Sequence, residues 1–336
     1  MTAVAAKGRG SGKIILTGEH AVVYGVKGIA AGIARGAHAH VELSDGPESR
    51  LTLGDRTVAA DENGDDLARA FAALLGASAA GPPVVVNAVA EIPPGGGLGC
   101  SAALSVAIAR AIDAAWSLEP DDQRVFERGM AWERVYHGNP SGIDTAAAMA
   151  GTFLVFERNV GHHTLYTAHD VWLAVAYSGS SASTKLMVDG VARIRTSRPE
   201  LFEKFLNGVK SITDNAVYAI DAADAQTLGK LMDYNQMLLA GMMLSTDTIE
   251  TMCKAARDAG ALGAKLTGSG GGGSVIALGG MCPRGEANSE AERLANVIAE
   301  RWSTAGFSAF ATRIAATPAA GGVAPQPSDS SSEEHS

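Results

Sequence analysis

A glycine-rich turn that runs straight into an apolar helical segment constrains the fold of this chain more than any other feature. Residues 91–103 read EIPPGGGLGCSAA and continue as LSVAIARAIDAAW. The apolar spacing predicts a helix over 101–116, and the preceding glycines leave bare backbone N–H groups at its start. Such a start carries unpaired donors and about half a positive charge, so it favours a bound phosphate. A flexible connector is the alternative interpretation, since the spacing matches neither the GxxxxGKS/T loop nor the GxGxxG turn.

Two further motifs favour a ligand-binding role for the glycine loops. GKIILTGEHAVVYG occupies 12–25, where a short apolar strand ends in a polar turn with Glu19 and His20, and Lys13 lies ahead of the strand. KLTGSGGGGSVIAL occupies 265–278 and places Ser269 among glycines between two apolar, strand-like runs. Because linkers seldom join two core segments, both glycine loops are expected to face a ligand.

Strand-like and helix-like runs interleave along the chain, which predicts an α/β or α+β layer fold. The expected strands are 12–17, 28–43, 83–91, 151–158, 171–179 and 307–314, and the expected helices are 65–76, 101–116, 121–138 and three amphipathic segments near 202–212, 228–238 and 249–256. A length of 336 residues predicts two domains. We expect an N-terminal domain at 1–170, a C-terminal domain at 171–315 and a disordered tail at 316–336, which lacks core-forming residues.

Composition disfavours several classes of protein. A net charge of −9 argues against a nucleic-acid partner, and no run approaches the roughly 20 apolar residues of a membrane span. The N-terminus lacks the apolar stretch of a secretory signal. The cysteines at 100, 253 and 282 show no CxxC spacing, and the eight histidines form no metal-ligand pattern. These features predict a reduced, cytoplasmic protein with no membrane partner.

The three motifs, in this order, resemble those of the small-molecule kinases named for galactokinase, homoserine kinase, mevalonate kinase and phosphomevalonate kinase. GEHAVVYG, together with HGNPSGID at 137–144 and MDYNQMLLAGMMLSTDTIE at 232–250, is most similar to the mevalonate kinase subgroup. The resemblance covers roughly 12–314. It implies an α+β fold in which an N-terminal ribosomal-protein-like domain and a C-terminal ferredoxin-like domain enclose the active site.

The sequence departs from the family pattern at two positions in the glycine loops. Cys100 stands where the family usually has a serine, and Ser274 follows the second glycine loop where a cysteine or alanine is common. Neither change removes an expected chemical group, because Ser101 is kept.

The resemblance assigns the phosphates of ATP to the first turn and the helix start. The implied ATP-binding residues are Pro94, Gly95, Gly96, Gly97, Leu98, Gly99, Cys100 and Ser101, with Gly270 and Gly271 closing from the opposite side. Magnesium keeps several waters and needs only one or two protein groups, and the resemblance gives that role to Ser101 and Glu133. Without the resemblance, Glu133 would be interpreted as an ordinary solvated carboxylate near a helix end.

By the same resemblance, Asp144 is the catalytic base, and Asn139, Pro140 and Gly142 form the turn before it. An N-cap on the following TAAAMA helix is the alternative interpretation, and the two are compatible. As a base, Asp144 accepts the proton late, as the loose transition state develops. Lys13 would keep Asp144 ionised and stabilise the transferring phosphoryl group.

The substrate-binding residues implied are Lys13, Glu19, His20, Asp144 and Thr184. Because an ionised glutamate is only an acceptor, Glu19 would take a hydroxyl or fix a partner, whereas His20 could serve the substrate carboxylate. The implied reaction is ATP-dependent phosphorylation of the primary hydroxyl of mevalonate to 5-phosphomevalonate in isoprenoid precursor synthesis.

The alternatives are a sibling kinase acting on phosphomevalonate, homoserine or a sugar, the related decarboxylase, and a non-catalytic nucleotide sensor. Few basic residues lie near Asp144 in the sequence, which favours an unphosphorylated substrate. The presence of Lys13, Glu133 and Asp144 disfavours the sensor. Many members of the family are dimers, so a homodimer stays open.

Overall fold

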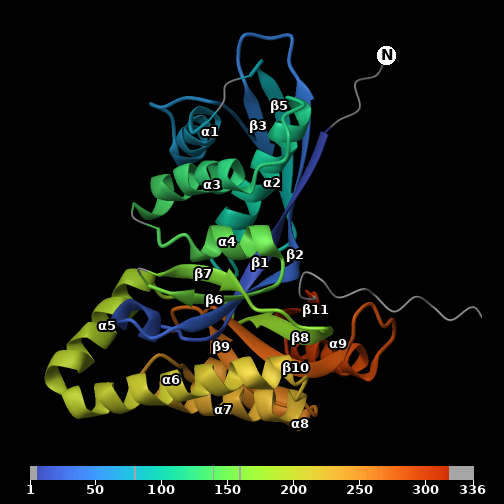
Figure 1. Ribbon diagram of the computed structural model, residues 1–336. Coiled ribbons are helices and arrows are strands. Elements are labelled where there is room, and N and C mark those ends of the chain that lie inside the picture. The colour runs from blue at the N-terminus through green and yellow to red at the C-terminus, as the bar shows by residue number, and fades with distance from the viewer. Residues whose placement is uncertain (1–5, 79–80, 139, 159, 318–336) are drawn as a thin grey trace, which may run out of the picture.

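The fold is an α+β assembly of two β-sheets with helices packed on their faces, seen in a computed structural model (Figure 1). Residues 6–78, 81–138, 140–158 and 160–317 are described. Asn139, and the part of the predicted tail beyond Thr317, lie outside the described residues.

The first sheet has seven strands, and β2 (Gly28–Leu43) is its long central member. The strand order is β4-β3-β5-β2-β6-β7, and β1 also pairs with β2. The remaining strands are β1 (Ala6–Thr17), β3 (Arg50–Leu53), β4 (Arg56–Ala59), β5 (Val84–Ala90), β6 (Phe153–Glu157) and β7 (Gly161–Thr164). The helices of this half are α1 (Asp66–Gly76), α2 (Cys100–Ala115), α3 (Asp122–His137) and α4 (Ile143–Ala150), and the short helix η1 (Ala21–Tyr24) follows β1.

Glycines allow α2 to lie directly against β1. A Cβ added at Gly8 would stand 2.1 Å from the Ala107 carbonyl oxygen, and one at Gly10 would stand 2.1 Å from that of Ala103. A side chain at either glycine would therefore push the helix off the sheet. This close contact holds the start of α2 beside the strand that carries Lys13.

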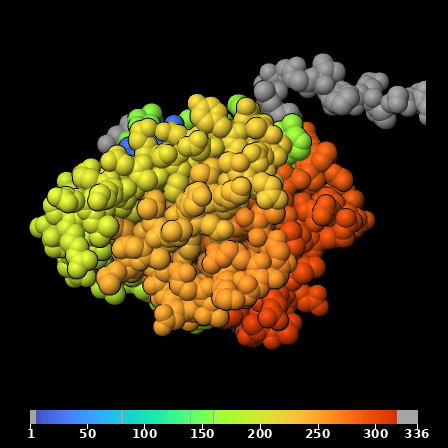
Figure 2. Space-filling view, turned by 90° about the horizontal axis from the view of Figure 1, so that it is seen from below, coloured from blue at the N-terminus to red at the C-terminus, as the bar shows by residue number. Residues whose placement is uncertain are grey.

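The second sheet has four antiparallel strands in the order β11-β8-β10-β9. These strands are β8 (His169–Tyr177), β9 (Ala264–Thr267), β10 (Ser274–Pro283) and β11 (Ser308–Ile314). Its helices are α5 (Thr184–Ser197), α6 (Pro199–Asp221), α7 (Ala225–Gly241), α8 (Asp247–Asp258) and α9 (Glu290–Thr304). Figure 2 shows the lower face of the molecule, where the yellow and orange residues of the C-terminal helices form most of the surface.

A continuous buried core joins the two sheets. One apolar cluster contains Ile14 and Phe71 from the first half together with Leu173 and Ile276 from the second. The α+β prediction is confirmed by this architecture. The chain passes from the first sheet to the second at β8, and the boundary near residue 170 stays a proposal. Among the described residues, every helix is too short or too polar to cross a lipid bilayer.

Most predicted elements are found within a few residues of their expected ends, and β2 matches 28–43. Among the differences, three stand out. First, β1 begins at Ala6 rather than near residue 12, because the glycines that hide its strand pattern serve the contact with α2. Second, the short β3–β4 hairpin was not predicted. Third, α5 and α9 were not predicted, although Ala291, Ala295, Ile298 and Trp302 give α9 a buried helical stripe.

Candidate active site

The first glycine turn ends in a helix start with no side-chain cap among the described residues. Gly99 is the N-cap of α2 and adopts a left-handed conformation with φ of +70°. The Lys13 N–H donates to the Leu98 carbonyl at 2.7 Å, which ties the turn to β1. The uncapped N–H groups of the first helical turn therefore remain suited to an anion.

Lys13 and Asp144 form an ion pair next to this turn. The Lys13 Nζ lies 3.0 Å from Asp144 Oδ1, with the lysine side chain 7% exposed and the aspartate 41% exposed. A Cβ added at Gly99 would stand 3.1 Å from the Lys13 Cβ, so the turn and the lysine are in close contact. The pair thus presents one accessible carboxylate and one buried ammonium beside the first glycine turn.

The N-cap interpretation of Asp144 is wrong. The N-cap of α4 is Gly142, with φ of +84°, and Asp144 is the second residue of the helix. Its side chain is free of a capping role because the left-handed glycine makes the turn instead. The local sequence suggested a cap because aspartate before a small-residue helix is typical of one.

Ser101 and Glu133 lie in direct contact. The Ser101 hydroxyl donates to Glu133 Oε1 at 2.5 Å and accepts from the Trp132 indole N–H at 3.0 Å. Glu133 is buried, so it is not the solvated carboxylate that its sequence position alone suggested. Burial raises the pKa of Glu133, and the charge of Asp144 raises it further, whereas Ser101, His137 and Lys13 oppose the shift.

These two side chains can hold a magnesium ion. They offer a hydroxyl and a carboxylate oxygen at the start of α2, the hard donors that magnesium prefers. The described residues contain no group of three or more His, Cys, Asp or Glu arranged to hold a metal, so the remaining ligands would be water and phosphate. A raised pKa at Glu133 fits this chemistry, since a cation would take the place of its proton.

Cys100 is compatible with the same turn. Burial raises the pKa of its thiol, and the nearby Glu133 carboxylate adds to the shift. The thiol therefore stays protonated and adds no negative charge beside a phosphate.

The polar turn after β1 contacts the second glycine loop. His20 has an unusual φ of +61°, and its Nε2 lies 2.7 Å from the Ser269 carbonyl oxygen. Because a carbonyl only accepts, Nε2 carries the proton. Burial lowers the pKa of His20, although the Ser269 carbonyl and Glu19 oppose this, so the neutral ring is favoured at neutral pH. A neutral ring is poorly suited to the predicted contact with a substrate carboxylate.

Glu19 is buried and fully engaged by protein partners. One carboxylate oxygen is paired with the Lys265 ammonium, and the other accepts from the Asn235 amide at 3.0 Å. Of the two roles considered for Glu19, this arrangement matches the fixing of a partner rather than acceptance from a substrate hydroxyl. Sequence reasoning did not identify Lys265 and Asn235 as partners of Glu19. A lysine within the apolar run 264–267 is itself a sign of a buried, paired charge.

The second glycine loop closes against both halves of the molecule. Ser274 donates to the Gly96 carbonyl at 2.7 Å, and the Thr184 hydroxyl lies 3.3 Å from the Ser269 hydroxyl. A Cβ at Gly270 would stand 2.4 Å from the Leu244 carbonyl oxygen, and one at Gly271 would stand 2.6 Å from the Met187 sulfur. Close packing is therefore sufficient to explain why glycine occupies these two positions, and no ligand is needed for that explanation.

The predicted residues thus gather in two adjoining groups. Lys13, Asp144, Ser101 and Glu133 lie around the first turn, His20 and Thr184 contact Ser269 of the second loop, and Glu19 precedes His20 in the chain. The Ser274–Gly96 hydrogen bond joins the groups.

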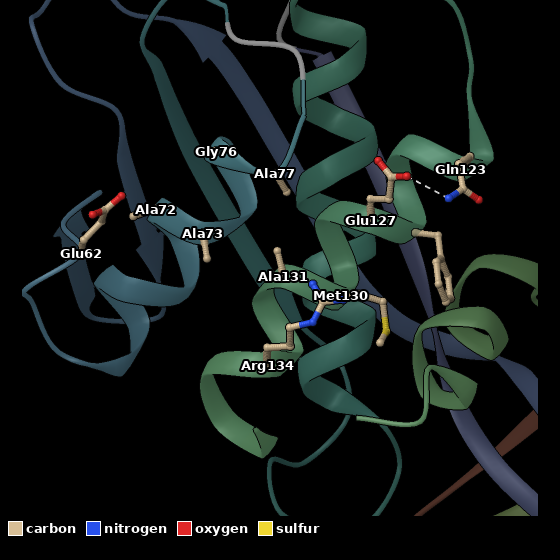
Figure 3. A pocket seen from close by; sticks show the side chains of 11 residues that line it. Glu62, Ala72, Ala73, Gly76, Ala77, Gln123, Glu127, Met130, Ala131 and Arg134 are labelled. Carbon is tan, nitrogen blue, oxygen red and sulfur yellow. Dashed lines mark hydrogen bonds between the residues drawn. The ribbon is translucent and has the colours of Figure 1, made fainter. Parts of the chain in front are cut away.

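A cavity of about 630 Å³ lies elsewhere, between α1 and α3 (Figure 3). Its labelled side chains include Glu62, Glu127, Met130 and Arg134, and it contains none of the predicted site residues. A second cavity, of about 380 Å³, lies on the α4 side of α3. The candidate site is therefore defined by the arrangement of its side chains and not by either cavity.

Comparison with known proteins identifies the family. The sequence model of the GHMP kinase N-terminal domain matches residues 66–152, and that of the C-terminal domain matches residues 216–304. The mevalonate kinase of Thermococcus gammatolerans is 33% identical over 79% of this chain and 86% of its own length. That of Methanothermobacter thermautotrophicus is 36% identical over 81% of this chain and 88% of its own length. The chain belongs to the GHMP kinase family, whose phosphoryl donor is ATP.

Solved structures agree with this assignment. The crystal structure of L. major mevalonate kinase in complex with R-mevalonate has a TM-score of 0.80 at 27% identity and covers 95% of this chain and 99% of its own. A Lactococcus lactis galactokinase complexed with galactose has a TM-score of 0.71 at 18% identity, covering 94% of this chain and 95% of its own, and shows the shared fold alone.

Proposed function

We propose that this chain transfers the γ-phosphoryl group of ATP to the primary hydroxyl of mevalonate, giving 5-phosphomevalonate and ADP. The Lys13–Asp144 ion pair beside an uncapped, glycine-rich helix start is the observation that carries the proposal. The similarity to proteins named mevalonate kinase, one of them solved with R-mevalonate, supports the choice of acceptor.

The first turn, from Pro94 to Ser101, binds the phosphates of ATP through the backbone N–H groups of the α2 start. Ser101 and Glu133 hold magnesium, which neutralises charge on the phosphates when it is bound. Gly270 and Gly271 shape the second loop so that it can lie over the site, and their ATP contact is part of the proposal.

Asp144 accepts the proton of the substrate hydroxyl. Its Oδ1 is paired with Lys13 and its side chain is 41% exposed, so we assign acceptance of the alcohol proton to Oδ2. Lys13 serves the same step, because a buried ammonium 3.0 Å away favours the ionised carboxylate and stabilises negative charge on the transferring group.

His20 and Thr184 bind the polar groups of mevalonate beside Ser269. Neutral His20, with Nε2 donating to Ser269, has Nδ1 left as an acceptor, so it suits a substrate hydroxyl. Glu19 acts indirectly, through its contacts with Lys265 and Asn235.

We further propose a division into domains near residue 170, action in the cytoplasm, and a homodimer as the assembly to test by light scattering.

A coupled assay of ADP release tests the proposal with four acceptors: mevalonate, phosphomevalonate, homoserine and galactose. We expect kcat/KM for mevalonate to exceed that for each other acceptor by roughly 10²-fold or more. A preference for another acceptor would identify a sibling kinase. An absence of ADP release with all four, in a chain that binds magnesium–ATP, would favour the nucleotide sensor.

A further inference from the structure

Next to the candidate site, the two sheets are joined by side-chain hydrogen bonds and not by backbone hydrogen bonds between paired strands. Among the described strands β1 pairs with β2 alone, which leaves its other edge open. At that edge the Ile15 N–H donates to the Thr267 hydroxyl at 2.7 Å, and the hydroxyl donates to the Ile15 carbonyl at 3.1 Å. The Lys265 ammonium also reaches this carbonyl, at 3.4 Å. Two side chains of β9 thus hold one residue of β1.

Lys265 is fully buried at this junction, and its three N–H donors each have an acceptor. They are the Glu19 carboxylate, the Leu266 carbonyl at 2.5 Å and the Ile15 carbonyl. Burial lowers the pKa of Lys265, and the Glu19 carboxylate opposes that shift. A buried lysine is tolerated when it is paired and fully hydrogen-bonded in this way.

Helix α7 holds the edge of β9 that does not pair with β10. The Asp233 carboxylate accepts from Ala264 N–H at 3.0 Å, and the Gln236 side chain accepts from Leu266 N–H at 2.8 Å. Asn235, between them in the sequence, donates to Glu19. These groups satisfy the outer edge of β9, so Lys265 projects from a strand held on both sides.

The residues that Lys265 contacts are direct neighbours of the predicted chemistry. Ile15 lies two residues after Lys13, Glu19 precedes His20, and the second glycine loop begins after Thr267. We propose that Lys265 is a positioning residue for phosphoryl transfer, which holds the Lys13 strand and the Glu19–His20 turn at a fixed separation from the second glycine loop. This inference rests on the proposed function.

The variant Lys265→Met tests the inference, because it keeps the length of the side chain and removes the ammonium. A displacement of about 1 Å at a reacting group costs roughly 10²-fold in rate, so kcat for mevalonate should fall by about that factor. The Kd for magnesium–ADP, measured by calorimetry, should stay within about twofold, because Lys265 does not contact the first glycine turn. An equal loss in both quantities would overturn the inference in favour of general misfolding.

The double variant Glu19→Gln/Lys265→Met separates positioning from loss of the fold. It removes the buried carboxylate that the single change leaves uncompensated, so it should be more stable than Lys265→Met and regain about tenfold in kcat. If Lys265→Met does not fold, the double variant carries the test, and a kcat equal to that of the unchanged chain would overturn the inference.

Arg257→Met is the matched control. Arg257 of α8 pairs with Asp233 of α7 and donates to the Ala264 carbonyl of β9, so it lies at the same junction, but its recorded contacts include neither Glu19 nor Ile15. We expect its kcat to be unchanged. A loss equal to that of Lys265→Met would show that any damage to this junction suffices, and would overturn the specific role of Lys265.

Amide hydrogen exchange gives a readout independent of turnover. Exchange in residues 15–24 should be faster in Lys265→Met than in the unchanged chain and in Arg257→Met. Unchanged exchange would overturn the inference. If the unchanged chain turns over mevalonate and Lys265→Met does so equally well, only the inference fails. If the unchanged chain turns over no acceptor, the proposed function fails and the exchange comparison decides whether Lys265 holds the turn.

Discussion

At the scale of single residues, burial changes the chemistry that the sequence suggests. Glu133 and Glu19 are both glutamates in polar segments, yet both are buried and hydrogen-bonded to protein partners. Asp144 keeps an accessible carboxylate, because only one of its oxygens faces Lys13. The three acids therefore differ in exposure and in the partners of their carboxylates.

Asp144→Asn should bind ATP almost normally and lose turnover by several orders of magnitude, since an amide cannot accept the proton. Steady-state kcat and the Kd for magnesium–ATP are the measurements. Asp122→Asn, which changes a first-turn acid of α3, is the control and should keep full activity. Turnover near that of the unchanged chain in Asp144→Asn would remove Asp144 as the base.

Ser101→Ala should raise the magnesium concentration needed for half-maximal activity, because one oxygen ligand is lost. Trp132→Phe should raise it less, since the indole N–H only orients the Ser101 hydroxyl. Magnesium titrations of activity and of nucleotide binding measure both effects. An unchanged magnesium requirement in Ser101→Ala would contradict the ligand assignment.

Glu133 should make stability depend on pH in the absence of magnesium. The folded state holds the Glu133 proton more tightly than the unfolded state, because burial raises the pKa. The free energy of unfolding therefore falls as pH rises from the ordinary glutamate range, about 4.3, toward the raised pKa. Glu133→Gln removes this loss, so its advantage in Tm over the unchanged chain should grow with pH. The exposed Glu127→Gln is the control, and an equal pH dependence in both variants would refute the assignment.

At the scale of elements, the contact between α2 and β1 places the first glycine turn. Gly10→Ala puts a methyl group against the Ala103 carbonyl, so we expect a loss of about 1–3 kcal/mol in the free energy of unfolding. Gly76→Ala, at the end of α1 with open space around it, should be neutral or slightly stabilising. Denaturant unfolding of the two variants compares them directly, and equal stabilities would show that α2 can move away from β1 at no cost.

At the scale of the whole molecule, the shared core predicts one cooperative unfolding transition. Trp132 lies in the apolar cluster that joins both sheets, and Trp302 lies in the cluster under the C-terminal helices. The fluorescence change that is missing in Trp132→Phe belongs to Trp132, and the change that is missing in Trp302→Phe belongs to Trp302. These two changes should therefore have the same denaturant midpoint. Two separate midpoints would show that the halves unfold independently.

The sequence alone determined the features that depend on neighbours along the chain. The glycine turn before an apolar helix, the strand over 28–43 and the helical periods of the second half could be predicted, because each reflects spacing within one segment. The motifs also identified the family and placed Lys13, Ser101, Glu133 and Asp144 among the candidates.

Only the tertiary structure decided how distant segments share charge and space. The Lys265–Glu19 pair joins residues 246 positions apart in the sequence, and the absence of a side chain at Gly8 and Gly10 is explained only by their contact with α2. It also showed that Gly142, and not Asp144, caps α4. Local patterns cannot encode these outcomes, because the free energy of an ionic or polar side chain depends on the water and partners left around it after packing.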